Sequence, residues 1–487
     1  MTPHRADDAT INARPVIHWF RRDLRLTDNL ALAAALETGA PVIPLFIFDP
    51  AILHSKRVGA PRVAFMRSAL ASLDASLRRH GSALLVRHGD PRRVLPALVE
   101  ATGAQGLYFN RDYSPFARRR DAEVARALPI PTHSFDDMLL VPPGEATKSD
   151  GDPYTVFTAF QRKWLTIPKP CPVAPASQSG AFDRLASVDS PGLPTLADLG
   201  FDTAIETPDA SEDSAHQLLA RFLSGPIYEY DSGRNRLGAD PDRDPTPGSS
   251  FLSPYFRFGI LSIREAYEAA QAAHGQAGDA RARKAVETWI SELAWREFYT
   301  HILFHFPQVK TGNFRRAYDS VPWRRAPADL QAWQEGRTGY PVVDAAMRQL
   351  AQTGWMPNRA RMIVASFLTK DLLIDWREGE LHFMQHLIDG DLAANNGGWQ
   401  WAAGTGTDAQ PYFRIFNPIL QGQRFDPEGV YIRRWVPELG DVPATQVHTP
   451  WASGHLPAGY PPPVVAHAFA RERALAAFAA ARERRPA

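Results

Sequence analysis

Residues that could bind a planar ligand are concentrated in WISELAWREFY, a stretch that begins at Trp289. Spacings of three and four residues would place four of its side chains near one face of a helix: Trp289, Glu292, Arg296 and Tyr299. Trp295 would lie beside Glu292, so two indole rings would flank a carboxylate that can accept hydrogen bonds. The same spacing is typical of a packing stripe with a surface ion pair, so this stretch does not decide between the two.

The stretch DGDLAANNGGWQWAAGTGTDAQPYFRIFNP begins at Asp389 and has no aliphatic run that could form a core element. It holds a second carboxylate at Asp391, an amide at Asn395, and indoles at Trp399 and Trp401. Its glycines would let the backbone approach a ligand closely. Two residues apart, the two tryptophans cannot share a helix face. We therefore expect them to serve different functions.

Three further motifs could bind ligands but also have plain structural readings. GWMPNRARMI places Asn358 and Met362 one turn apart, which also fits a helix started by proline with Met in the core. The hydroxyl groups of GSSFLSPYFRFG could bind phosphate at a helix start or serve as a simple N-cap. The basic clusters NFRR, WRR and NRAR lie among aromatic residues, which suits nucleic acid as well as a solvated face.

Several common catalytic motifs are absent. HILFH and HFMQH each hold two histidines at i and i+4, but neither has the glutamate of HExxH, so we expect no metal. WFRRDLRLTDN follows the first expected strand in place of GxGxxG, which excludes the ordinary dinucleotide fingerprint. The sequence also contains no GxxxxGK[ST] and no GxSxG, which disfavours a P-loop ATPase and an α/β-hydrolase.

The elements that must position these residues divide the chain into two halves. Short apolar runs at 15–20, 41–48, 83–89 and 106–111 alternate with helical patterns, which predicts a parallel sheet covered by helices on both faces. The segment rich in Pro, Gly and Ser predicts a long linker, and the chain after it is mostly 3.6-periodic, ending in a basic amphipathic helix. We predict an α/β domain over 1–140, a linker over 141–215 and an all-α domain over 216–487.

Composition indicates the compartment. The single cysteine, Cys171, excludes an internal disulfide framework and suits a reducing cytoplasm. The first twenty residues have no apolar signal segment, and no later run is long enough to span a membrane. The net charge is +1, so nucleic acid would have to bind a local patch. We expect a cytoplasmic protein that does not bind membranes.

Taken together, five motifs resemble the photolyase/cryptochrome flavoproteins, most closely the bacterial class I cyclobutane-pyrimidine-dimer photolyases. They are HWFRRDLRLTDNLAL, GSSFLSPYFRFG, ISELAWREFY, GWMPNRARMI and the stretch from Asp389, in family order over about residues 15–450. The resemblance implies a Rossmann-like antenna domain, a linker and a helical domain that holds FAD, active as reduced FADH⁻. It implies a light-driven lyase that acts on UV-damaged DNA, and we expect this enzyme to be a monomer.

The resemblance assigns residues to the cofactor. Those expected near its phosphates and ribose are Tyr230, Ser249, Ser250, Leu252 and Ser253. Those expected around the flavin are Trp289, Glu292, Arg296, Asn358 and Arg359, with Asp389 and Asp391 at the ring edge and Asn395 facing N5. Trp399, Trp376 and Trp323 match the family's electron path from flavin to surface.

The resemblance also assigns residues to a dimer flipped out of DNA. Trp295 and Trp401 would pack its apolar side, Glu292 and Asn358 would hydrogen-bond its polar edge, and Met362 would fill the space beside it. Light-excited FADH⁻ would donate an electron, the ring would split and the electron would return, with Glu292 stabilising the radical anion. Residues expected to contact phosphates are Arg234, Arg359 and Arg414.

Two positions distinguish branches of the family, and two bear on the antenna. Where this chain has Asn395, plant cryptochromes have Asp and insect cryptochromes have Cys. The (6-4) photolyases have His residues near the positions of Asn358 and Met362, and this chain has none there. We therefore favour dimer repair over a cryptochrome-like photoreceptor that signals through partner binding. Phe116 and Ala117 stand where folate-binding relatives have an Asn-Glu pair. This leaves three alternatives: a deazaflavin, another pigment or an empty site. NRDYSPFARRRD resembles the deazaflavin-binding type more than the folate-binding type.

Overall fold

A computed structural model describes residues 14–173, 181–238, 248–452, 454 and 456–483. The first thirteen residues, considered above for a signal segment, and the last two of the expected tail helix lie outside the described residues. Among the described residues, none of the helices has the length and apolar character needed to cross a membrane.

The first domain is built on a parallel five-stranded sheet with strand order β3-β2-β1-β4-β5. The strands are β1 (Val16–Phe20), β2 (Val42–Phe48), β3 (Leu85–His88), β4 (Leu107–Asn110) and β5 (Thr132–Phe135). The first four agree with the apolar runs in the sequence. β5 was not predicted because its residues are only partly buried at the sheet edge and include no apolar run.

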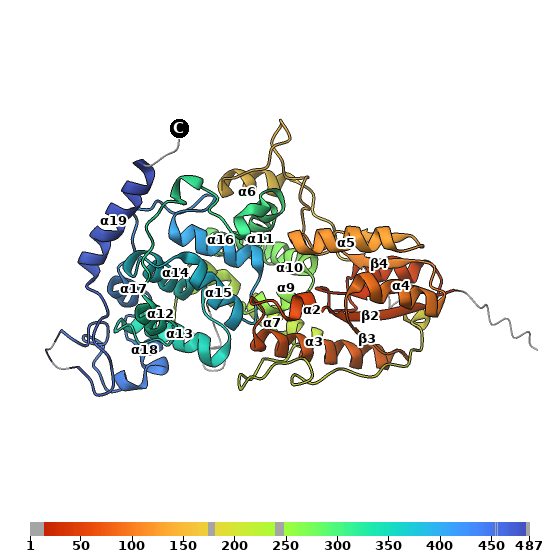
Figure 1. Ribbon diagram of the computed structural model, residues 1–487, viewed down its shortest axis with the longest axis horizontal. Helices are drawn as coiled ribbons and strands as arrows, with labels where there is room; N and C mark the ends of the chain where they lie inside the picture. The colour runs from red at the N-terminus through yellow and green to blue at the C-terminus, as the bar shows by residue number, and fades with distance from the viewer. Residues whose placement is uncertain (1–13, 174–180, 239–247, 453, 455, 484–487) are drawn as a thin grey trace, which may run out of the picture.

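Helices cover both faces of this sheet, as predicted (Figure 1). They are α1 (Leu30–Glu37), α2 (Pro50–Leu53), α3 (Ala60–Arg79), α4 (Pro91–Thr102) and α5 (Pro115–Ala127). Alternate residues of β1 enter different cores: Phe20 packs with α1 and α3, whereas Ile17 and Trp19 pack with α4 and α5. This alternation is the two-sided burial expected of a parallel strand.

The segment between the domains is more ordered than its composition predicts. It contains α6 (Phe157–Thr166) and the short η2 (Ala181–Arg184), and α7 (Glu212–Leu223) begins near its end. Phe157, Phe160 and Trp164 of α6 are buried at spacings of three and four residues. The short helix was missed because it lies between two stretches rich in proline and glycine.

The second domain is helical, and the predicted fold class is confirmed. Its α-helices are α8 (Tyr230–Gly233), α9 (Ser253–Phe258), α10 (Ile263–Gln276), α11 (Ala280–His305), α12 (Pro327–Gln334), α13 (Pro341–Thr353), α14 (Asn358–Ser366), α15 (Trp376–His386), α16 (Leu392–Ala403), α17 (Pro418–Phe425), α18 (Val430–Trp435) and α19 (His467–Glu483). Its other helices are η3 (Pro226–Glu229), η4 (Pro307–Lys310), η5 (Arg316–Tyr318), the π-helical η6 (Phe367–Asp371) and η7 (Pro437–Leu439). Figure 1 shows α19 at the end of the molecule opposite the sheet.

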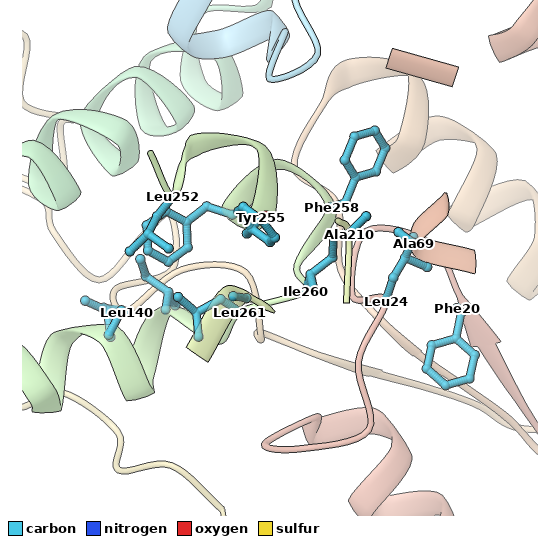
Figure 2. Packing of buried hydrophobic residues seen from close by; sticks show 14 of the residues in the cluster. Phe20, Leu24, Ala69, Leu140, Ala210, Leu252, Tyr255, Phe258, Ile260 and Leu261 are labelled. Atoms are coloured by element: carbon cyan, nitrogen blue, oxygen red, sulfur yellow. The ribbon is translucent and has the colours of Figure 1, made fainter. Parts of the chain in front are cut away.

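The two domains share one hydrophobic core. Figure 2 shows Leu252, Tyr255 and Phe258 of the helical domain in the same cluster as Phe20 and Leu24 of the sheet domain. Because this core is continuous, the domains are packed as one unit.

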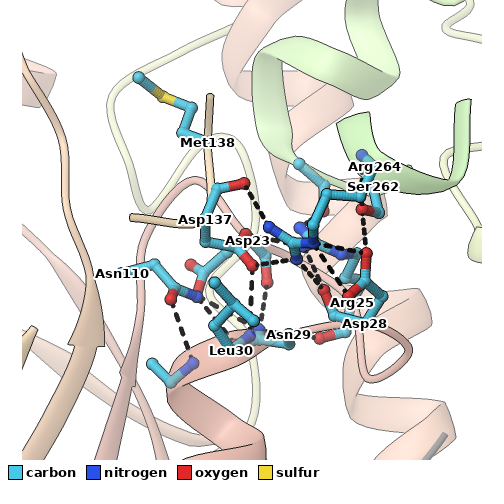
Figure 3. Close-up of polar contacts among 12 residues, drawn as sticks. Asp23, Arg25, Asp28, Asn29, Leu30, Asn110, Asp137, Met138, Ser262 and Arg264 are labelled. Carbon is cyan, nitrogen blue, oxygen red and sulfur yellow. Dashed lines mark hydrogen bonds and ion pairs between the residues drawn. The ribbon is translucent and has the colours of Figure 1, made fainter. Parts of the chain in front are cut away.

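Beside that core, a buried ion-pair network crosses between the domains (Figure 3). Arg264 of α10 contacts Asp28 at 3.0 Å and Asp137 at 2.7 Å, and Arg25 contacts Asp137 at 2.7 Å. All four side chains are buried, and removing one would leave an opposite charge without its partner. The network therefore fixes the relative position of the sheet and α10.

Candidate functional site

The helical domain contains a cavity of about 490 Å³, here called the central cavity. Segments far apart in the sequence converge on it, and most of the expected site residues line it. These are Tyr230, Arg234, Ser249, Ser250, Leu252, Ser253, Trp289, Glu292, Trp295, Arg296, Asn358, Met362, Asp389, Asp391, Asn395, Trp399 and Trp401. The volume lies within the range of ligand and cofactor pockets.

One face of α11 forms a wall of the central cavity. Trp289, Glu292, Trp295, Arg296 and Tyr299 all line it, as their spacing predicts. The helix is started by Asp279, whose carboxylate caps it by accepting from the Ala282 amide at 2.7 Å. With 26 residues, α11 extends from this cap across the domain.

Contacts from other elements hold two of these side chains. Trp295 stacks on Phe157 of α6, with ring centroids 3.6 Å apart, so the helix missed in the sequence fixes a wall of the cavity. Glu292 forms an ion pair with Arg234, which itself lines the cavity. The Glu292 side chain is 30% exposed, so its carboxylate is accessible from the cavity.

The serine-rich loop before α9 lines the cavity next to α11. Trp289 Nε1 donates to Ser250 Oγ at 3.4 Å, and Ser253 Oγ donates to Asp389 at 2.6 Å. Phe251, between them, has a φ of +54° and packs against Trp355 at 4.4 Å. The loop therefore brings hydroxyl groups to the cavity, although α9 itself has only six residues.

Asp389 has one oxygen bonded and one free. Its Oδ2 accepts from Ser253 Oγ at 2.6 Å and from Arg361 Nη2 at 2.8 Å. Its Oδ1 is buried and has no hydrogen-bond partner among the described residues. A buried acceptor of this kind requires a donor, and one supplied by a ligand in the cavity would satisfy it.

Asp391 is held as an anion. Its Oδ1 caps α16 by accepting from the amides of Ala393 and Ala394, and its Oδ2 accepts from Arg22 Nη2 at 2.7 Å. Burial alone would raise the pKa of Asp391, but the charges of Arg22 and Arg257 hold it well below its ordinary value. The carboxylate is therefore a fixed acceptor in the cavity.

The arginines around these carboxylates were not predicted as site residues. Arg22, Arg257 and Arg361 line the central cavity, and burial lowers the pKa of Arg257 to about 9. Arg22 comes from the sheet domain, directly after β1, and reaches a residue 369 positions later. The sequence signal for Arg22 is the motif WFRRDLRLTDN, and that for Arg361 is NRARMI. The first motif indicates the family and the second suits nucleic acid, and neither by itself indicates a contact with these carboxylates.

The two expected amides lie at different depths. Asn395 Nδ2 donates to the Glu380 carbonyl at 3.0 Å, and its Oδ1 has no partner among the described residues. This orientation leaves the carbonyl oxygen as the free polar group of a side chain that lines the cavity. Asn358 is exposed at the start of α14, with Met362 one turn away.

The three tryptophans of the expected electron path differ in their burial and surroundings. Trp399 lines the cavity and packs so closely on α15 that a Cβ on Gly379 would lie 2.1 Å from its ring. Trp376, one turn before Gly379, is fully buried and donates to Asn313 Oδ1 at 2.8 Å. Trp323 is half-buried.

Arg359 and Arg414 do not line the central cavity. Arg359 donates to Asn235 Oδ1 at 2.7 Å and lies over the Phe425 ring at 4.3 Å. Arg414 is exposed. The placement of Arg359 differs from its expected position in the flavin pocket because Asn235 and Phe425 hold its guanidinium outside.

The histidine pairs have other partners. His301 is bonded to the Val141 carbonyl at 2.8 Å, and burial lowers its pKa to about 4. His386 Nδ1 lies 2.8 Å from the His382 carbonyl. Within the described part of the chain, no group of three or more His, Cys, Asp or Glu side chains is placed to hold a metal ion.

The antenna positions lie at the start of α5. Ala117 is buried, and Phe116 lies 5.7 Å from the Arg120 guanidinium. Neither side chain can hydrogen-bond a chromophore. Nearby, the Arg21 guanidinium lies 4.9 Å from the Trp19 ring centre and 4.6 Å from that of Phe109.

The donor set of the central cavity fits FAD. Aromatic walls suit a planar ring system, arginine and serine groups suit phosphates, and the free oxygens of Asp389 and Asn395 suit N–H groups. An α/β domain joined to a helical domain with such a cavity defines a two-domain flavoprotein. The family model for the FAD binding domain of DNA photolyase matches residues 289–480, and that for DNA photolyase matches residues 16–177. The chain belongs to the DNA photolyase family.

The similarity to known proteins covers nearly the whole chain. The deoxyribodipyrimidine photo-lyase of Synechococcus sp. is 44% identical over 464 residues, covering 93% of this chain and 94% of the relative. The crystal structure of a bacterial class III photolyase from Agrobacterium tumefaciens has a TM-score of 0.88 at 37% identity, covering 98% of this chain and 100% of that one. An archaeal photolyase from Sulfolobus tokodaii, solved with two FAD molecules, has a TM-score of 0.80 at 33% identity and covers 96% of this chain and 100% of that one.

Proposed function

We infer that this protein is a deoxyribodipyrimidine photolyase, which splits cyclobutane pyrimidine dimers in UV-damaged DNA in light. The observation that carries this inference is that one cavity combines the residues expected to hold FAD with those expected to receive the dimer. Trp295, Trp401, Glu292, Asn358 and Met362 line the same space as the carboxylates and serines.

The cofactor would be held by the groups whose partners are incomplete. Asp391, kept ionised by Arg22 and Arg257, and Asp389 Oδ1 would accept hydrogen bonds from the flavin edge. The carbonyl oxygen of Asn395 would favour a protonated nitrogen opposite it, as the reduced flavin has at N5. When bound and reduced, FAD supplies a light-excited electron to the dimer.

The protein's own groups would position the dimer. A dimer inside a duplex must be flipped out, and its damaged pairing lowers that cost. Trp295 and Trp401 provide apolar walls that exclude water, and Glu292 and Asn358 provide polar groups for the base edges. Arg234 lines the cavity, whereas Arg359 and Arg414 lie outside it. These three arginines would contact the phosphates that flank the dimer.

We propose a second, light-harvesting chromophore in the sheet domain. The Sulfolobus relative has a second FAD molecule, described as a novel light-harvesting cofactor. Phe116 and Ala117 offer no polar group for a folate, which supports a deazaflavin or another ring system over a folate. We also propose that the protein acts as a monomer in the cytoplasm, where DNA is accessible and its exposed Cys171 stays reduced.

Irradiating the FAD-loaded, reduced protein with an oligonucleotide that contains a thymine dimer tests the proposed activity. We expect intact thymines to be recovered in blue or near-ultraviolet light and not in the dark. Failure to recover them, with FAD bound and changing its spectrum in light, would indicate a photoreceptor instead. The absorption spectrum of the purified protein would identify the antenna chromophore.

A further inference from the structure

A second cavity, of about 750 Å³, lies between η5 and the last turns of α19. We call it the α19 cavity. Its walls are formed by Arg315, Arg316, Ala317, Tyr318, Tyr412, Ala479, Arg482 and Glu483. None of these residues lines the central cavity.

The α19 cavity is positively charged. Three arginines face one carboxylate, Glu483, and none of the three has an acidic partner within the described residues. Arg315, Arg316 and Arg482 are all exposed, and the Arg482 guanidinium lies 5.7 Å from the Tyr412 ring centre. Unpaired guanidinium groups around an aromatic wall suit a small organic anion.

An aromatic cluster joins this cavity to Trp323. Tyr412 stacks on Phe478 with centroids 5.9 Å apart and planes 5° apart, and Tyr318 contacts the same ring at 5.7 Å. Phe478 in turn contacts Trp323 edge-on at 5.8 Å. The cavity wall is therefore two ring contacts from the tryptophan at which the expected electron path reaches the surface.

The helix that carries this wall is firmly anchored. Phe478 is fully buried, and the Lys370 ammonium lies 3.6 Å from its ring centre. At the start of α19, His467 pairs with Asp371 at 2.5 Å, and Arg473 donates to the Asp371 carbonyl at 2.5 Å. The cavity is thus part of the folded domain and not a gap beside a loose end.

We propose that the α19 cavity binds a small reducing anion of the enediolate class, which returns an electron to Trp323 after that residue has been oxidised. The proposal rests on the proposed function and on the expectation, implied by the family resemblance, that light oxidises Trp323 through the tryptophan path. One electron passes from the bound anion to the Trp323 radical cation and restores the neutral indole. The anion loses its enediol proton to water and leaves as its one-electron-oxidised radical.

The shape and charge of the cavity favour a small anion over a DNA phosphate. Ala317 and Ala479 give it apolar wall area against which the carbon skeleton of a small molecule can pack. Glu483 in its wall would repel a polyanion, whereas a single small anion has room to bind the arginines away from that carboxylate.

Ascorbate is the probe that tests the proposal, with the full-length protein loaded with FAD. Titration in the dark measures binding, and the decay of the Trp323 radical after a flash measures electron return. We expect the decay rate to saturate with ascorbate concentration in the unchanged protein. Arg316→Ala and Arg482→Ala should each weaken binding about tenfold, the effect of losing one charge-assisted hydrogen bond, and move the half-saturating ascorbate concentration up by the same factor. Arg281→Ala, an exposed arginine at the start of α11, is the matched control.

Three further results would decide the matter. A decay rate that is linear in the unchanged protein, or arginine variants that behave like the control, would overturn the proposal. So would a loss of affinity for undamaged oligonucleotide in Arg316→Ala, which would assign the cavity to DNA.

Repair by the chemically reduced enzyme should be the same in all variants. A protein that binds ascorbate with saturation but repairs no dimers would contradict the proposed function and leave this site standing.

Discussion

At the scale of single residues, the central cavity holds two kinds of carboxylate. Asp391 is fixed by Arg22 and by the amides at the start of α16. Glu292 has one ion pair, with Arg234, and its side chain is 30% exposed. A carboxylate with few fixed partners can exchange them when a ligand arrives, which suits Glu292 to a substrate and Asp391 to a resident cofactor.

Replacing Glu292 by alanine tests that division. We expect Glu292→Ala to weaken binding of dimer-containing DNA about tenfold, because it removes a charged hydrogen-bond acceptor, and to lower the repair quantum yield. Titration with a dimer oligonucleotide and single-turnover photolysis measure the two effects. Glu287→Ala, on the exposed side of the same helix, is the control. An undiminished quantum yield in Glu292→Ala would rule out a role in stabilising the split dimer.

Lys370 is a buried amine whose effect on stability depends on pH. Burial lowers its pKa from 10.5 to about 7, so between these values the unfolded chain binds a proton that the folded protein does not. The free energy of unfolding should therefore rise with pH across this window, by up to about 1.4 kcal/mol per pH unit. Lys370→Met should remove that rise. Urea unfolding at several pH values measures it, and an equal slope in both proteins would contradict it, with Lys284→Met as the exposed control.

At the scale of elements, adjacent glycines of α16 meet different surroundings. A Cβ on Gly397 would lie 2.1 Å from the Tyr299 ring, whereas one on Gly398 would meet no protein atom within 4 Å. Gly398 lines the central cavity. We infer that Gly397 lets α16 pack on α11, and that Gly398 keeps space for the cofactor.

The two glycines should respond differently to alanine. Gly398→Ala should raise the melting temperature of the protein without FAD slightly, since alanine favours a helix over glycine by roughly 0.5–1 kcal/mol. It should also weaken FAD binding, because the added methyl group enters the cavity. Gly397→Ala should lower the melting temperature by displacing Tyr299. Thermal unfolding and FAD titration of both variants measure these effects, and equal FAD affinities in Gly398→Ala and the unchanged protein would contradict the assignment.

At the scale of the whole molecule, what could be predicted depended on whether the signal was local. Short apolar runs predicted β1 to β4, and a 3.6-residue pattern predicted the face of α11, because each is a property of one segment. They could not predict that Trp295 stacks on Phe157, since the two come from elements whose packing no local pattern encodes. For the same reason the family motifs indicated the cofactor residues of the helical domain, but not that Arg22 of the sheet domain reaches Asp391.

Arg22 makes the sheet domain part of the cofactor site, and this can be tested. Its Nη2 lies 2.7 Å from Asp391 Oδ2, and its Nε donates to the Arg257 carbonyl at 3.2 Å. Arg22→Gln would remove one of the charges that hold the pKa of Asp391 down. As pH falls, Asp391 should then lose its charge at a higher pH than in the unchanged protein. We expect FAD affinity to fall about tenfold at neutral pH and further in mild acid.

A second interdomain ion pair supplies the control for this prediction. Arg57 of the sheet domain pairs with Glu380 of α15 at 2.8 Å, and neither residue lines the central cavity. Arg57→Gln therefore removes a contact between the domains through a side chain that does not line the central cavity. FAD titration by fluorescence from neutral to mildly acidic pH should separate the two variants, with only Arg22→Gln showing the steeper loss in acid. If both lose FAD equally and with the same pH dependence, Arg22 acts by holding the domains together and not through Asp391.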